Sequence, residues 1–183
     1  MLVRDGDRSG AARMVEQLSD VLRRTLTRHR TNEVTLGEEL ELVRQYLAIE
    51  QARFSDRLRP DFAIDSSVLA ASVPSFAVQH LVENAIRHGI AKRSDAGRVR
   101  VAARRDGDML EVTVSDDGPG LDVQAAIPIG HGIENTRARL RALYGERASL
   151  VVASAAQGEP AGTIATLRVP YRELTRERDD AER

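Results

Sequence analysis

The sequence of 183 residues predicts an α+β fold, a two-layer α/β sandwich with helices on one face of a mixed, mostly antiparallel sheet, preceded by one or two N-terminal helices. Two observations predict it. Helical and strand patterns are mixed along the chain, in the order of two helices followed by β-α-β-β-α-β-β. An Asp-Gly pair at residues 106–107 lies between two alternating segments, which is typical of a β-hairpin.

The first two helices are expected at residues 11–30 and from residue 35 onward. The first has an apolar stripe that steps by three or four positions, at Val15, Leu18, Leu22 and Leu26. This stripe has to be buried, either on the domain's own core or in the seam of a bundle or dimer, and the sequence leaves both open. Thr35 and Glu38 have the spacing of a capping box at the start of the second helix.

Strand and helix patterns then follow in turn. Residues 57–65 predict a strand with a proline at the sheet edge, and residues 66–74 a loop or short turn. Pro74 suits the first turn of the next helix and Gly89 its end. After the hairpin, residues 133–145 predict a helix that stops at Gly145, and two more strands are expected at 149–154 and 163–170.

We expect three parts: N-terminal helices at residues 1–54, the main α+β domain at 55–172 and a charged tail at 173–183. The formal net charge is −1, so a general affinity for nucleic acid or for anionic membranes is not indicated. The chain has no Cys, which excludes a disulfide framework and a thiolate metal site. No apolar run approaches the roughly 20 residues that span a bilayer.

The helix that contains "HLVENAIRHG", residues 80–89, carries polar residues where a buried helix would carry Leu or Ala. Asn84 lies in its middle, where Asn is unfavourable and, if buried, needs partners. It is either a satisfied core residue or a ligand for a hard cation through its side-chain oxygen. Arg87 and His88 follow three and four residues later, next to the same face, where they could meet phosphate.

Two glycine-rich stretches accompany this helix. "SDDGPG" follows a strand and brings Asp116 to the strand end, as a simple turn or as an acceptor for an exocyclic amine. Gly118 and Gly120 would allow the backbone to pass close to a flat ring. "GHGIEN" is either a loop or an anion site at a helix N-terminus. Thr163, after a glycine, is a hydroxyl donor at the start of the last strand.

In this order the motifs resemble those of the GHKL ATPases, the superfamily of gyrase, heat-shock chaperones, histidine kinases and mismatch-repair enzymes, which have the Bergerat fold. "LVENAIRHG" resembles the N box, "DDGPG" and "GHGIEN" the two glycine boxes, and "GT" the last motif. The chain from about residue 11 to 170 is most similar to the LytS-like sensor histidine kinases, with linker helices before the HATPase domain.

The resemblance implies ATP and Mg²⁺ as cofactors, with Asn84 as the metal ligand and Asp116 bound to the adenine amine. Residues 121–129 would form a lid over the ATP. Asn84 and Glu83 are the catalytic candidates, although Glu83 is offset by about 100° and points elsewhere. The nucleotide-binding candidates are Asn84, Arg87, His88, Asp116, Gly118, Gly120, Gly130, His131, Gly132 and Thr163.

Two departures from the superfamily pattern shape the expected function. Gyrase and the chaperones carry a water-activating Glu one turn before the metal Asn, but this chain has His80 there, which favours phosphoryl transfer over hydrolysis. The family's acceptor His lies in an Asn-Pro-His-Phe-like segment, and none of His29, His80, His88 and His131 does. The chain therefore looks like a fragment that begins after the acceptor helix, or like a natural truncation.

The expected function is the ATP-binding part of a cytoplasmic, two-component histidine kinase, either soluble or the inner part of a membrane-anchored sensor. Its partners would be the upstream phosphoacceptor helix, a response regulator and a second copy in a homodimer. Two alternatives are a nucleotide-gated interaction module without transferase activity and an anti-sigma-type serine kinase, against which His80 argues.

Overall fold

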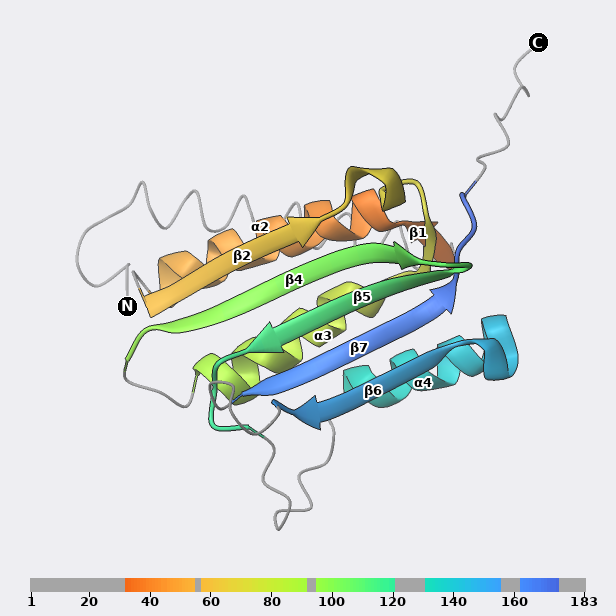
Figure 1. Cartoon of the computed structure of the whole chain (residues 1–183). Helices are drawn as coiled ribbons and strands as arrows, with labels where there is room; N and C mark the ends of the chain where they lie inside the picture. The colour runs from red at the N-terminus through yellow and green to blue at the C-terminus, as the bar shows by residue number, and fades with distance from the viewer. Residues whose placement is uncertain (1–31, 55–56, 92–94, 121–130, 156–161, 175–183) are drawn as a thin grey trace.

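A five-stranded sheet in the order β2-β4-β5-β7-β6 forms one layer of the molecule (Figure 1). The computed structural model describes residues 32–54, 57–91, 95–120, 131–155 and 162–174. β2 pairs with β4 in parallel and the other three pairings are antiparallel, so the sheet is mixed as predicted. The strands are β2 (Leu58–Ile64), β4 (Gly97–Asp106), β5 (Met109–Asp116), β6 (Ser149–Ser154) and β7 (Thr163–Pro170).

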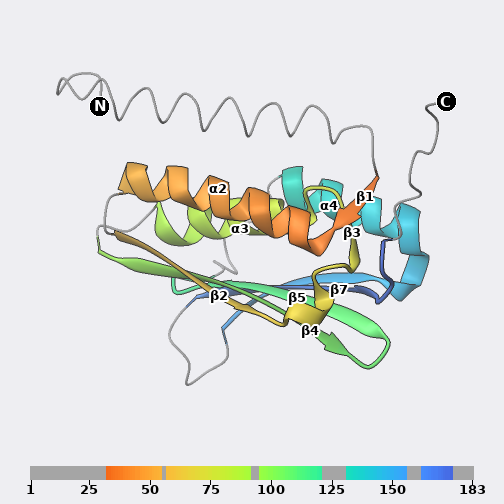
Figure 2. The same ribbon diagram turned by 90° about the horizontal axis from the view of Figure 1, so that it is seen from above.

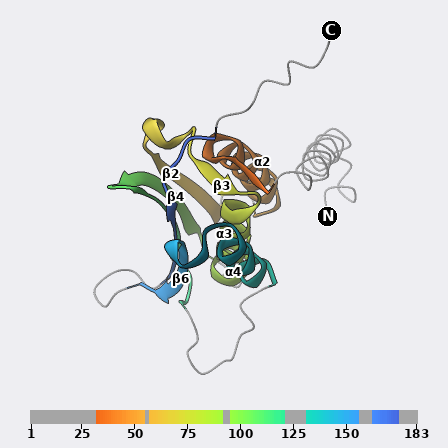
Figure 3. The same cartoon turned by 90° about the vertical axis from the view of Figure 1, so that its right-hand side faces the viewer.

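Within the described part of the chain, α-helices cover one face of this sheet (Figures 2 and 3). They are α2 (Leu36–Phe54), α3 (Ala77–Ala85) and α4 (His131–Tyr144). Alternate residues of β4 and β5 point into the core because side chains alternate across a strand: Val99 and Val101 are buried, whereas Arg98 and Arg100 are exposed. The predicted two-layer sandwich is confirmed.

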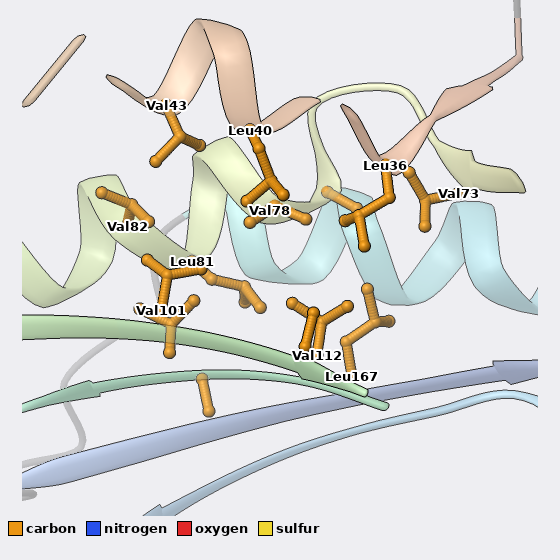
Figure 4. Close-up of a cluster of buried hydrophobic side chains, with 14 of the residues drawn as sticks. Leu36, Leu40, Val43, Val73, Val78, Leu81, Val82, Val101, Val112 and Leu167 are labelled. Carbon is orange, nitrogen blue, oxygen red and sulfur yellow. The ribbon is translucent and has the colours of Figure 1, made fainter. Parts of the chain in front are cut away.

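The core lies between the helices and the sheet (Figure 4). Leu36, Leu40 and Val43 of α2 are fully buried there with Val78, Leu81 and Val82 of α3. Val101, Val112 and Leu167 belong to the same cluster from the sheet side. Helix α2 thus shares its core with the sheet, and the predicted division between residues 54 and 55 does not separate two cores.

A two-stranded sheet of β1 (Glu33–Thr35) and β3 (Ser72–Pro74) was not predicted. The expectation that residues 66–74 form only a loop or short turn is therefore incomplete, since only residues 66–68 form a 3₁₀ turn, η2. The prediction that Pro74 lies in the first turn of a helix is wrong. Pro74 is the last residue of β3, where it pairs with Glu33. The predicted capping box is confirmed. The Glu38 carboxylate accepts a hydrogen bond from the backbone N–H of Thr35 at 2.9 Å, and the backbone N–H of Glu38 donates to Thr35 Oγ1 at 3.3 Å.

The prediction that Gly89 ends the third helix is wrong. The chain continues from α3 into a π-helical turn, η3 (Ile86–Ile90), in which the Ala91 N–H donates to the Ile86 carbonyl at 2.8 Å. Gly145, by contrast, follows α4 directly and adopts a φ of 60°, which stops that helix as predicted. The predicted helix at 11–30 and the tail after residue 174 lie outside the described residues.

Candidate active site

The N-terminus of α3 is held by a carboxylate from α2. Glu39 is 0 % exposed and accepts from the backbone N–H groups of Phe76 at 2.8 Å, Val78 at 3.2 Å and Gln79 at 3.5 Å. These are among the N–H groups that a helix start leaves without partners. Phe76 itself has a φ of 64°, a left-handed conformation that costs a bulky residue about 1–2 kcal/mol. Glu39 therefore fixes where the helix with Asn84 begins.

One face of α3 is apolar and packs on the sheet, and the polar residues of the helix lie outside this face. Asn84 is half-buried, and its side-chain amide forms no hydrogen bond with another described residue. His88 is half-buried and Arg87 is exposed. Glu83 accepts from the Gln79 amide at 2.8 Å, so this carboxylate is engaged along its own helix.

Asp116 ends β5 and is packed against two glycines. It is 8 % exposed, and its Oδ1 accepts from the Gly118 N–H at 2.9 Å. A Cβ on Gly89 would lie 2.4 Å from this Oδ1, and one on Gly118 would lie 2.4 Å from the Gly89 Cα. The turn after α3 thus touches the first glycine box, and only glycines allow the contact.

The Gly162-Thr163 motif lies next to Asp116 at the start of the neighbouring strand β7. In the β5–β7 register Asp116 lies opposite Thr163, which in turn lies opposite Ser154 of β6. A Cβ on Gly162 would come 1.9 Å from the Asp116 carbonyl oxygen. Gly120 has a φ of 82°, which favours glycine. Three sequence motifs, the N box, the first glycine box and the Gly162-Thr163 pair, therefore meet at one end of the sheet.

The helix after the second glycine box packs on α3 through His80. His80 Nδ1 lies 3.1 Å from Thr136 Oγ1, and the Thr136 hydroxyl donates to the Gly132 carbonyl at 2.7 Å. A Cβ on Gly132 would lie 3.2 Å from the His80 ring. Burial is the main cause that lowers the pKa of His80, and Arg139 lowers it further while Glu83 raises it. The ring is therefore neutral at pH 7.

A pocket of about 500 Å³ opens between α3 and α4. Phe76, Gln79, His80 and Glu83 line it from the α3 side, and Arg139 faces them from α4. Arg139 donates to the Ser75 carbonyl at 2.6 Å. Neither Asn84 nor Asp116 lines this pocket, so it is distinct from the position of the adenine candidate.

The structure thus brings Asp116, Gly118 and Thr163 together at the end of α3, and Gly132 against His80. Gly130 and residues 121–129 lie outside the described residues, as does the side chain of His131. Sequence reasoning missed Glu39 and Thr136 as parts of the site, and it included Gly89 and Gly162 in its motifs without predicting their contacts with Asp116. Glu39 left a signal, because it interrupts the apolar stripe of Leu36, Leu40 and Val43.

Comparisons with known proteins identify the family of this chain. The sequence pattern of the family described as "Histidine kinase-, DNA gyrase B-, and HSP90-like ATPase" matches residues 74–173, which include α3, both glycine boxes and Thr163. The chain belongs to this ATPase family. A second pattern, "Histidine kinase", matches residues 1–58.

Relatives of this family include the sensor protein LytS of Staphylococcus haemolyticus, which is 39% identical over 79% of this chain and 26% of the relative. The sensor histidine kinase BtsS of Escherichia coli is 38% identical over 91% of this chain and 29% of the relative. The chain therefore spans less than a third of the length of these proteins.

Solved structures of the same fold include the mycobacterial sensor histidine kinase MprB, with a TM-score of 0.56 and 19% identity over 78% of this chain and 98% of that one. The catalytic domain of the histidine kinase ThkA has a TM-score of 0.58 at 13% identity, over 78% of this chain and 97% of that one. Among the described helices, none is long and apolar enough to cross a membrane.

Proposed function

We propose that this chain is the ATP-binding catalytic region of a two-component sensor histidine kinase. It transfers the γ-phosphoryl group of ATP to a histidine outside this chain, from which the group passes to a response regulator. The observation that carries the proposal is the packing of Asp116 against Gly89 and Gly118, because it places a fixed carboxylate at the end of the ATPase family's nucleotide helix.

Each candidate residue has a part in this proposal. Asp116 accepts from the six-amino group of adenine, and the close-packed glycines allow the ring to approach the backbone. Thr163 supports the adenine end from the neighbouring strand. Arg87 and His88 are directed to the phosphates, together with Gly120, Gly130, His131 and Gly132 at the glycine boxes.

Asn84 is the proposed Mg²⁺ ligand. Its half-buried amide has no hydrogen-bond partner among the described residues, and an amide oxygen is a ligand that suits Mg²⁺. When bound, the ion would neutralise charge on the phosphates and orient them for transfer. Glu83, one residue earlier, is engaged with Gln79, so we assign it an electrostatic part beside the pocket.

The proposal favours transfer over hydrolysis because His80, and no carboxylate, lies one turn before Asn84. We place the reaction in the cytoplasm, where ATP is supplied. In the complete kinase we expect two copies to pair through the upstream helices.

The test is incubation with γ-labelled ATP and Mg²⁺, with this chain alone and with a separate helical segment that carries the family's Asn-Pro-His-Phe sequence. We expect label on the added segment only, and we expect it to survive base but not acid. Acid-stable label would instead indicate a serine kinase, and no label on any partner would indicate an interaction module. Label on the isolated chain that is lost in His29→Gln would overturn the claim that the acceptor lies outside.

A further inference from the structure

The two ring nitrogens of His80 have different surroundings. The Thr136 hydroxyl has one hydrogen, and it donates that hydrogen to the Gly132 carbonyl. We therefore assign the ring proton to Nδ1 of His80, which lies 3.1 Å from Thr136 Oγ1 and donates to it in this tautomer. In a neutral imidazole this leaves the lone pair on Nε2.

Nε2 is the nitrogen available to the pocket between α3 and α4. It forms no hydrogen bond within the described part of the chain, whereas the ring's Cγ and Cδ2 pack against the Gly132 position. Glu83 of the same helix and Arg139 of α4 are the charged groups that act on the ring. Burial lowers the pKa of His80, so Nε2 is unprotonated at pH 7 and can take up a proton.

The position of His80 along α3 brings this basic nitrogen near the metal candidate. His80 and Asn84 are four residues apart, so their Cβ atoms are about 5–6 Å apart on one helix face. His80 lines the pocket between α3 and α4, whose polar lining also includes Glu83 and Arg139. A planar, neutral ring that enters this pocket would meet Nε2 of His80 as a proton acceptor.

We propose that His80 is a catalytic residue of the phosphoryl transfer, whose Nε2 accepts the proton of the incoming acceptor imidazole. This proposal rests on the proposed function. One acceptor nitrogen forms the N–P bond while the bond from the γ-phosphorus to the bridging oxygen breaks and ADP leaves. The proton on the other acceptor nitrogen passes to Nε2, and the resulting His80 imidazolium later releases it to water.

The two nitrogens can be tested separately. In His80→Asn the side-chain amide takes the place of Nδ1 and can still donate to Thr136, but no basic nitrogen remains. Thr136→Val keeps the base and removes the bond that orients it. A purely structural role for His80 would make Thr136→Val the more damaging change, whereas the proposal makes His80→Asn the more damaging one.

The first measurement is the initial rate of label transfer to the Asn-Pro-His-Phe segment, beside the affinity for Mg-ATP in a calorimetric titration. In His80→Asn we expect the affinity to stay within about twofold and the rate to fall about 10²–10⁴-fold, the range for a lost general base. Arg141→Gln, an exposed change on α4, is the matched control and should match the parent. A parent-like rate in His80→Asn refutes the base and leaves the proposed function standing.

The second measurement is the pH dependence of the same rate. Two imidazoles must be neutral in the parent, so the logarithm of the rate should rise with a slope of about two on the acid side, and with a slope of one in His80→Asn. A ring-NMR titration of the isolated chain should show the Nδ1–H tautomer of His80 and a pKa below 6.5. A protonated Nε2 at pH 7 would overturn the assignment, and absence of transfer in the parent would remove the proposed function as well.

Discussion

Gly89 leaves room for the carboxylate of Asp116: a Cβ at residue 89 would lie 2.4 Å from Asp116 Oδ1. The two residues come from opposite layers, one from the turn after α3 and the other from the end of β5. Their contact sets the distance between the nucleotide helix and the strand that carries the adenine candidate.

Gly89→Ala should therefore displace Asp116 and weaken ATP binding more than it weakens the fold. The methyl group meets a carboxylate at less than van der Waals distance, so the strand end or the turn has to shift. We expect at least a tenfold loss of ATP affinity by calorimetry. Ala91→Ser, in the exposed position two residues later, is the control, and equal affinities for the two variants would contradict the assigned packing.

Asp116→Asn should remove discrimination between ATP and GTP. A carboxylate accepts from the six-amino group of adenine and rejects the carbonyl of guanine, whereas an amide can donate as well as accept. The lost contact is worth about 1–3 kcal/mol. Competition titrations with both nucleotides measure it, and equal affinity of the parent chain for ATP and GTP would exclude the role.

Asn84→Ala and Asn84→Asp should abolish Mg²⁺-dependent ATP affinity and leave the fold intact. The amide forms no hydrogen bond with other described residues, so its removal leaves no described partner unsatisfied. Calorimetric titration with and without Mg²⁺, beside a thermal melt, separates the two effects. Unchanged Mg-ATP binding in Asn84→Ala would show that the metal ligand lies elsewhere.

Glu39→Ala should destabilise the whole domain. It leaves three backbone N–H groups at the start of α3 without their acceptor, and hydrogen bonds to charged groups contribute roughly 1.5–3 kcal/mol each. We expect a loss of roughly 3 kcal/mol or more in urea unfolding. Glu41→Ala, an exposed change on the same helix, should cost under about 0.5 kcal/mol. A similar cost for both variants would mean that the cap is not needed.

Glu33 should make stability depend on pH in the acid range. Burial raises its pKa, but hydrogen bonds from Tyr144, Arg172 and Ser72 outweigh burial, so that the pKa lies below the ordinary 4.5. The folded state then binds fewer protons than the unfolded one near pH 4. The stabilisation is present above pH 4.5 and is lost as the pH falls through the lowered pKa. Thermal melts of the parent and of Glu33→Gln should converge as the pH falls below 4.5, and a difference in melting temperature that does not change with pH would contradict this role of Glu33.

Local sequence patterns were sufficient for the elements whose causes are local. Alternation along β4 and β5 follows from burial on one face, and the Thr35–Glu38 box caps its own helix. Pro74 was misread because its conformation depends on pairing with Glu33, 41 positions earlier in the chain. Glu39 likewise caps a helix that begins 38 residues later, so its place in an apolar stripe marks it as unusual without showing which helix it caps.

The site could be predicted in its parts but not in its contacts. The motifs singled out Asn84, Asp116 and the glycines because each residue type has its own chemistry. The contact of Gly89 with Asp116 could not be predicted, because it depends on a π-helical turn that extends α3 past the expected stop. The bond of His80 to Thr136 joins residues 56 positions apart and depends on how two helices pack.

The cap that Glu39 provides for α3 also limits how this ATPase unit can be moved between proteins. A chimera joined after residue 54 would take the nucleotide helix without the carboxylate that holds its first turn, and without the leucines that cover it. A junction before residue 32 would carry both. Sensors that exchange catalytic units by recombination should therefore exchange α2 with them, because α2 supplies both the cap of α3 and part of the core that covers it.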